Sequence, residues 1–228
     1  MLTTVLFAVG ASAPLAIGAL VGVRWEPPKL LVAGALAFAA GALIVSASFE
    51  LFEPAFEYGG RWRAGLSFAG GAAVFVIADT YLDRKTAGSA AGFALLAAVT
   101  LDGIPENTAL GVSLNSTGSL ALLVAVFASN FPEALTGARR MMDKGLNPKV
   151  VVGLWFTATV LLALAVVAGK YLFAGISPQG LSYPLAFAGG AVLASVIDTL
   201  APEAFGEGGP IVALASAGGF VTGFLLSL

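Results

Sequence analysis

The sequence predicts an all-α integral membrane protein with eight transmembrane helices, folded as a single domain over residues 1–228. Of the 228 residues, 58% are hydrophobic and only 11% are charged, whereas a soluble domain carries about 25% charged residues. Apolar runs close to the roughly 20 residues that cross a bilayer follow one another along the chain. Turn residues fill the short connections, as in Glu26-Pro27-Pro28 and Gly206-Glu207-Gly208-Gly209. No soluble domain fits in the remaining length.

The predicted helices have approximate bounds of 2–23, 30–52, 64–81, 90–114, 120–138, 150–173, 181–200 and 211–228. Short connections make successive helices antiparallel neighbours. The odd-numbered connections contain more of the lysines and arginines than the even-numbered ones. Because basic residues gather on the cytoplasmic side, we expect both termini to lie outside a plasma or bacterial inner membrane. The opening Met1-Leu2-Thr3-Thr4 has no basic residue, so we expect no cleavable signal peptide.

The composition excludes several classes of function. The chain contains no cysteine and no histidine, which excludes disulfides, thiolate and imidazole metal ligands, and Ser-His or Cys-His catalysis. It contains no basic tract of the kind that binds nucleic acid. The expected surroundings are therefore a lipid bilayer, and no nucleic-acid partner is expected.

The sequence contains signs of an internal repeat. Phe68-Ala69-Gly70-Gly71-Ala72 and Phe187-Ala188-Gly189-Gly190-Ala191 are each followed by an Asp-Thr pair at the same spacing. In the second and seventh predicted helices, an acid stands four residues before a proline: Glu50 before Pro54, and Asp198 before Pro202. These two helices should cross the membrane in opposite directions, as in the inverted repeats of many transporters.

Two short stretches place a Pro-Glu pair near the middle of an apolar run. They are Asp102-Gly103-Ile104-Pro105-Glu106 and Ser129-Asn130-Phe131-Pro132-Glu133. A carboxylate at that depth costs several kcal/mol unless it is paired, hydrated or bound to a cation. Each proline also frees a backbone carbonyl one turn earlier. Carboxylates and freed carbonyls are oxygen ligands for a cation.

The spacing of these residues predicts a metal site between two helices. Asp102 and Glu106 are four apart, and Asn130 and Glu133 are three apart, so each pair shares one helix face. Ser129 can add a further ligand. The ionisable residues inside the apolar runs are all acidic, so they attract cations and have no basic partner at that depth. Asp79 and Asp198, nearer the cytoplasmic helix ends, are candidates for an exit pathway.

Other interpretations remain open from the residues alone. The four central polar residues could form a hydrogen-bonded patch that holds two helices together, and Asp79 and Asp198 could be solvated interfacial acids. An intramembrane aspartyl hydrolase would use two of Asp79, Asp102 and Asp198. The Tyr-Asp and Gly-x-Gly-Asp patterns expected of such an enzyme are absent. We therefore expect a protein that is not an enzyme.

The same stretches resemble a known family. Residues 102–114 resemble the fourth helix of the ZIP (ZRT/IRT-like) metal transporters, whose pattern is His-Asn-x-Pro-Glu-Gly, and residues 130–133 resemble the fifth. Similar stretches are Ala13-Pro14-Leu15-Ala16-Ile17-Gly18 and the end of the seventh helix, residues 198–203. The resemblance implies eight helices in a 3+2+3 bundle and a homodimer. It also implies uptake of zinc, iron, manganese or cadmium into the cytoplasm, with the metal as substrate and no cofactor.

The sequence departs from the family pattern at the predicted site. Asp102 stands where the family has histidine, Gly103 where it has asparagine, and Asn107 where it has glycine. The sixth predicted helix, residues 150–173, has no acid to complete a second metal site. Oxygen ligands alone suit Mn, Fe(II) or Mg better than nitrogen-containing sites do, although zinc also accepts carboxylates. The departures leave open a metal sensor or inactive relative that does not transport.

Overall fold

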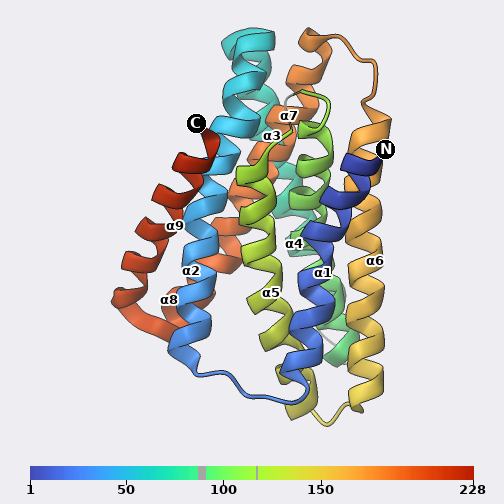
Figure 1. Cartoon of the computed structure of the whole chain (residues 1–228), viewed down its shortest axis with the longest axis vertical. Coiled ribbons are helices and arrows are strands. Elements are labelled where there is room, and N and C mark those ends of the chain that lie inside the picture. Colours follow the sequence, from blue (N-terminus) through green and yellow to red (C-terminus); the bar gives the residue numbers. More distant parts are fainter. Residues whose placement is uncertain (87–90, 117) are drawn as a thin grey trace.

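The computed structural model describes residues 1–86, 91–116 and 118–228, and within them it is helical with no strand. This confirms the predicted all-α class. Residue 90, where the fourth predicted helix begins, lies outside the described residues. The helices in chain order (Figure 1) are α1 (Leu2–Gly22), α2 (Lys29–Ser46), the π-helix η1 (Ala47–Phe52), α3 (Glu53–Thr86), α4 (Ala91–Ser113), α5 (Leu120–Asp143), α6 (Pro148–Leu172), α7 (Pro178–Ser195), the π-helix η2 (Val196–Leu200), α8 (Ala201–Gly208), the 3₁₀ turn η3 (Gly209–Ile211) and α9 (Val212–Ser227).

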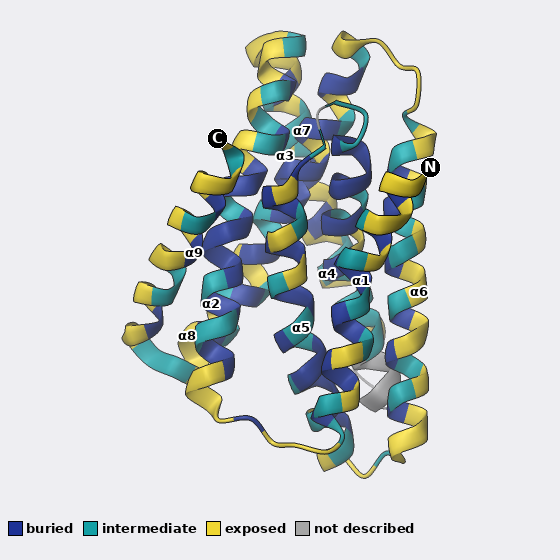
Figure 2. Cartoon of the chain, viewed as in Figure 1, coloured by how far each residue is buried: buried dark blue, intermediate teal, exposed yellow. Residues whose placement is uncertain are grey.

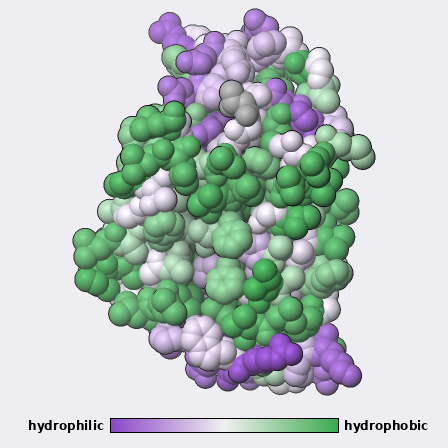
Figure 3. Space-filling model, viewed as in Figure 1, coloured by the Kyte–Doolittle hydropathy of each residue, from purple (hydrophilic) through white to green (hydrophobic). Residues whose placement is uncertain are grey.

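The outer surface of the bundle is apolar around its middle. Figure 3 shows hydrophobic side chains over the centre of this face and hydrophilic side chains gathered at its two ends. By length and composition, five helical stretches could cross a membrane: Leu2–Gly22, Lys29–Leu82, Leu120–Asp143, Pro148–Leu172 and Pro178–Ser227. Large exposed apolar side chains such as Leu66, Leu164 and Leu214 would be unfavourable in water. These features indicate a membrane protein.

The helices pack as two groups, which we call the first group (α1, α4, α5 and α6) and the second group (α2, α3, α7, α8 and α9, with η1 and η2). In the first group α1 packs on α5 and α6, and α4 packs on α6. In the second, α3 packs on α7, and α2 packs on α8 and α9. The groups meet mainly where α2 contacts α5 and α4 contacts α7. Both termini lie toward the upper end of Figure 1, and the α1–α2, α5–α6 and α8–α9 connections lie at the lower end. Figure 2 shows the buried residues along the inner sides of the helices.

Two segments of the second group carry the same features in the same order, and corresponding residues are separated by the same number of positions in the sequence. Phe38 in α2 corresponds to Phe187 in α7, and Ser46 to Ser195, each serine being the last residue before a π-helix. Both segments end at a glycine with positive φ, Gly60 at 72° and Gly209 at 66°, where the chain reverses direction (Figure 1). Figure 1 also shows that α2 and α7 run in opposite directions.

The prolines that follow give a reason for the two π-helices. Pro54 and Pro202 have no N–H, and their rings conflict with the carbonyl four residues earlier, on Glu50 and Asp198. A wider turn relieves that conflict, and π-turns are frequent at functional sites. The acid-then-proline pattern of the sequence therefore marks two distorted turns.

Glycines let the helices of the second group approach very closely. A Cβ at Gly71 in α3 would overlap the carbonyl of Phe187 in α7, and a Cβ at Gly190 in α7 would overlap the carbonyl of Phe68 in α3. Small residues at helix crossings are the usual way to pack helices in lipid, where the hydrophobic effect does not drive them together. These two reciprocal contacts fix the α3–α7 pair.

Several helix bounds differ from the predicted ones. The third predicted helix, 64–81, covers only part of α3, which runs from Glu53 to Thr86 and contains the reversal at Gly60. The fifth, 120–138, continues to Asp143, and the seventh, 181–200, becomes π-helical at Val196 and continues as α8. In each case the helix extends past the apolar run into charged residues. Hydropathy identifies the lipid-facing part of a helix and does not mark where its hydrogen bonds end.

Candidate metal site

The predicted site lies where α4 and α5 run through the interior of the bundle. Pro105 and Pro132 both fall inside their helices, and each leaves a carbonyl without its helical N–H donor. Ser119 caps the start of α5, since its side chain accepts a hydrogen bond from the Leu122 N–H at 2.9 Å. The short connection from α4 into this cap returns the chain antiparallel, so the two Pro-Glu pairs can lie at a similar height.

Ser129 and Glu106 join the two helices directly. The Ser129 hydroxyl lies 3.0 Å from Glu106 Oε2, a contact in which it donates to the carboxylate. It also lies 3.0 Å from the carbonyl of Val126. The Glu106 residue is only 2% exposed, and within the described part of the chain its second oxygen, Oε1, has no hydrogen-bond partner. One carboxylate oxygen is thus held and the other is left available.

Asn130 is held in the same way. Its Nδ2 donates to the backbone carbonyl of Ala11 in α1 at 2.7 Å. Its Oδ1 has no partner among the described residues, although the residue is only 1% exposed. A buried polar atom without a partner costs free energy unless a water or an ion satisfies it. Asn130 Oδ1 and Glu106 Oε1 are therefore two buried oxygens suited to a cation.

Asp102 faces the second group. Its Oδ1 accepts from the Thr199 hydroxyl at 3.3 Å and from the Ser195 hydroxyl at 3.4 Å. The residue is 6% exposed. Asp79 in α3 and Asp198 in η2 are near enough to act on its carboxylate electrostatically. The two acids predicted for an exit pathway thus lie around Asp102, with Asp198 exposed and Asp79 half-buried.

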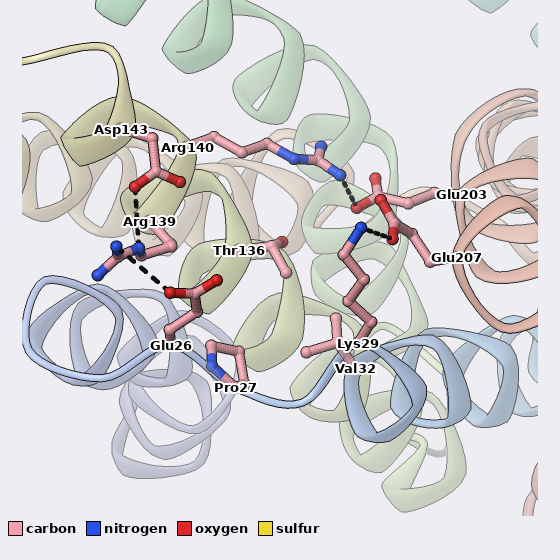
Figure 4. A pocket seen from close by; sticks show the side chains of 10 residues that line it. All are labelled: Glu26, Pro27, Lys29, Val32, Thr136, Arg139, Arg140, Asp143, Glu203 and Glu207. Carbon is pink, nitrogen blue, oxygen red and sulfur yellow. Dashed lines mark hydrogen bonds and ion pairs between the residues drawn. The ribbon is translucent and has the colours of Figure 1, made fainter.

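Glu133 lies between the buried acids and one end of the molecule. Its carboxylate interacts electrostatically with those of Glu106, Asp102 and Glu203. The residue is half-buried, unlike Glu106. Glu203, in α8, belongs to the cavity at the lower end that Figure 4 shows. Glu133 therefore connects the interior acids to that end electrostatically.

The arrangement limits what could hold a metal. Among the described residues, no group of three or more Asp and Glu side chains is spaced to bind one ion. Carboxylates alone would not complete a coordination shell here, so the Ser129 hydroxyl, the Asn130 amide oxygen or freed carbonyls would have to contribute. Hard cations accept such mixed oxygen ligands.

Sequence reasoning gave no site role to three residues near the predicted ligands. Ser195 and Thr199 contact Asp102 from the second group. The Asp-Thr pair of the internal repeat was a signal for Thr199, and no signal pointed to Ser195. Asn107, fully buried beside Glu106 in the chain, donates through Nδ2 to the carbonyl of Gly103 at 2.8 Å. Its Oδ1 has no partner within the described residues.

The comparisons with known proteins give a distant relative. No protein-family model matches the sequence. The chain is 28% identical over 184 residues to an Arabidopsis thaliana protein whose printed name is "Putative zinc transporter At3g08650". The match covers 75% of this chain and 30% of that protein, so the chain spans less than a third of the relative's length. Over three quarters of its sequence, the chain is similar to part of a protein that is named for zinc transport.

Proposed function

We propose that this protein is a divalent-metal transporter of the ZIP type, with its ion site between α4 and α5. The observation that carries the proposal is the pair of buried oxygens, Glu106 Oε1 and Asn130 Oδ1, that find no partner in the described part of the chain. Glu106 also makes the contact with Ser129 that joins the two helices. The name of the Arabidopsis relative supports a metal as the substrate. The apolar centre of the face shown in Figure 3 supports a site within a bilayer.

The proposed membrane arrangement has eight crossings in a 3+2+3 plan. They are α1, α2, the part of α3 after Gly60, α4, α5, α6, α7 and α9. The matched segments that end at Gly60 and Gly209, running in opposite directions, support an inverted repeat. The lower end carries the α1–α2 and α5–α6 connections with most of the described basic residues, so we place it in the cytoplasm and both termini outside.

The proposed ligands are Glu106, Asn130, Glu133, Asp102 and Ser129. All supply oxygen, which favours hard or borderline divalent ions such as Mn, Fe(II) or Zn as the transported substrate. Cadmium remains a candidate from the family resemblance. The metal is cargo here, so binding must be strong enough to capture the ion and weak enough to release it.

The two helix groups suggest how the ion moves. The proposed ligands all lie on the first group, while the contacts on Asp102 come from the second. Movement of one group against the other would expose the site to one side and then to the other, which is alternating access. The family resemblance favours transport into the cytoplasm.

Zinc uptake into proteoliposomes tests the proposal. The purified protein should accumulate zinc, and Glu106→Gln, which removes the charge at nearly constant shape, should reduce uptake at least tenfold. Glu57→Gln is the matched control, because Glu57 is an exposed carboxylate of α3, and it should transport normally. Equal uptake by wild type and Glu106→Gln would contradict the proposed site. Calorimetric zinc binding without any uptake would identify a metal sensor instead.

A further inference from the structure

A cavity of about 230 Å³ opens at the lower end of the molecule, between the two helix groups. Figure 4 shows that its walls carry three sets of ion pairs. Arg140 contacts Glu203 at 2.8 Å. Lys29 contacts Glu207 at 3.3 Å. Arg139 contacts Asp143 at 3.0 Å and Glu26 at 3.5 Å.

These ion pairs differ in what they connect. Lys29 and Glu207 both belong to the second group, and the Lys29 side chain is 81% exposed. Arg139 and Asp143 both lie on α5, and Glu26 lies in the α1–α2 connection. Arg140 is on α5 in the first group and Glu203 is on α8 in the second. Of the ion pairs among the described residues, only the Arg140–Glu203 pair joins a helix of one group to a helix of the other.

Glu203 is the least exposed acid among the ion pairs that line this cavity. Its side chain is 22% exposed, against 37% for Glu207, 56% for Asp143 and 73% for Glu26. The Arg140 side chain is 44% exposed, so the pair is partly shielded from solvent. Solvent screens the attraction in a partly shielded pair less than in a fully exposed one, so this pair resists separation more than a fully exposed pair would.

Glu133 and Arg140 connect the proposed ion site to this pair along α5. Glu133 interacts electrostatically with Glu106 and Asp102 and also with Glu203. Arg140 stands seven residues after Glu133 on α5, two turns along the same helix face. Arg140 also lines the cavity, so its guanidinium lies two turns from Glu133 on the side toward the lower end.

We propose that the Arg140–Glu203 ion pair is a latch that closes the path from the ion site to the cytoplasm; this rests on the proposed function. The pair ties the two groups together at the lower end, so a movement that separates them there must break it. Its guanidinium also repels a divalent cation while it neutralises Glu203. An ion that arrives at Glu133 attracts Glu203 and repels Arg140, so the ion itself favours opening.

Thiol labelling in the cysteine-free chain tests the latch without relying on transport. Thr136→Cys introduces a reporter in the wall of the cavity, one turn beyond Glu133. Its rate of reaction with N-ethylmaleimide, a neutral reagent, reports access to the thiol once the thiol pKa of each variant has been measured from the pH dependence of the rate, because only the thiolate reacts. On the Thr136→Cys background, Arg140→Gln and Glu203→Gln should each accelerate labelling at least threefold, and the double variant no further. Arg140→Glu combined with Glu203→Arg should restore slow labelling. Lys29→Gln, which breaks a pair within the second group, is the matched control and should leave the rate unchanged.

Zinc uptake by the same variants separates the latch from a direct role of Glu203 in binding the ion. A latch predicts that Arg140→Gln and Glu203→Gln change the uptake rate in the same direction. Loss of uptake in Glu203→Gln alone would overturn the latch and make Glu203 an ion ligand. Unchanged labelling in both single variants would overturn it as well. Absence of zinc, manganese and iron(II) uptake by the wild type would refute the proposed function, whereas the labelling rates would still report whether the pair limits access to position 136. Arg140→Lys keeps the charge and provides a folded reference if Arg140→Gln is unstable.

Discussion

The two helix groups use their polar side chains in opposite ways. In the first group, Glu106 accepts a hydrogen bond from Ser129 through one carboxylate oxygen, and Asn130 donates one to the Ala11 carbonyl. The second side-chain oxygen of Glu106 and the side-chain oxygen of Asn130 are buried and have no partner within the described chain. In the second group, hydroxyls tie helices together: Ser67 in α3 donates to the carbonyl of Tyr183 in α7, and Ser182 in α7 donates to that of Ala55 in α3, both at 2.7 Å. The proposed ion site lies in the first group, and the hydroxyls that tie α3 to α7 belong to the second, which we call the frame. Close glycine crossings occur in both groups, because a Cβ at Gly111 in α4 would overlap the carbonyl of Val166 in α6.

This difference predicts which substitutions affect stability and which affect ion binding. Unpaired buried oxygens cost free energy in the empty protein and recover it when a ligand binds. Close backbone packing with reciprocal hydrogen bonds instead stabilises one arrangement of helices. We therefore expect changes in the frame to affect folding, and changes between α4 and α5 to affect ion binding with little loss of stability.

The largest expected effect is on folding of the second group. Gly71→Leu would force a side chain into the carbonyl of Phe187. Overpacking by even a few methylenes costs about 1–3 kcal/mol, so a leucine against backbone should lower stability by more than about 3 kcal/mol. The melting temperature in detergent measures this loss. Gly70→Leu is the matched control, since a Cβ at Gly70 meets open space. Similar melting temperatures for the two variants would show that the α3–α7 contact is not rigid.

The next effect belongs to the first group. Asn130→Ala removes a proposed ligand oxygen and the hydrogen bond to Ala11, so the Kd for zinc should rise at least tenfold, about 1.4 kcal/mol. The melting temperature should change little. Asn115→Ala is a suitable comparison, because Asn115 also donates to a backbone carbonyl, that of Lys170 at 3.1 Å, but lies in the turn that follows α4. Equal effects of the two substitutions on the Kd would remove Asn130 from the site.

A smaller effect concerns selectivity at Asp102. Asp102→His replaces a hard anionic oxygen by a softer nitrogen, and affinity rises more steeply from Mn to Zn for nitrogen ligands. The ratio of Zn to Mn affinity should therefore increase, roughly fivefold, about 1 kcal/mol. Competition of Mn against Zn in calorimetric binding measures the ratio. Asp102→Ala should instead weaken both ions together. An unchanged ratio in Asp102→His would place Asp102 outside the coordination shell.

Much of this contrast could be predicted from the sequence, because its causes are local. Glu106 follows Asp102 by four residues and Glu133 follows Asn130 by three, so each pair places its side-chain oxygens on one helix face. The apolar runs on both sides fix the depth of that face. The closeness of Ser129 to Glu106 follows from two similar motifs on neighbouring antiparallel helices. The helical content and the positions of the acids along the helices could therefore be predicted without knowledge of the tertiary structure.

The remaining contacts depend on tertiary geometry that no local pattern encodes. A serine or threonine in an apolar helix usually bonds to its own helix, as Ser12 does with the Ala8 carbonyl and Thr100 with that of Leu96. The repeated Asp-Thr pair draws attention to Thr199, but no pattern in the sequence shows that its hydroxyl reaches Asp102 on another helix. The Arg140–Glu203 pair spans 63 residues and depends on how α8 turns after η2. Such contacts follow from the packing of the two groups.

The smallest expected effect tests whether the second group belongs to the ion site. The hydroxyls of Ser195 and Thr199 lie 3.4 and 3.3 Å from Asp102 Oδ1, longer than the usual O–H···O hydrogen bond of up to about 3.0 Å, so each should contribute little to binding. Ser195→Ala and Thr199→Val should change the zinc Kd less than about threefold, below about 0.7 kcal/mol. They should alter the uptake rate more than the Kd, because a contact between moving groups exists in only part of the transport cycle. Thr222→Val, whose hydroxyl bonds to its own helix at Gly218, is the control for loss of a threonine hydroxyl. A tenfold rise in the Kd for Thr199→Val would make its hydroxyl an ion ligand, and the second group would then be part of the site as well as its frame.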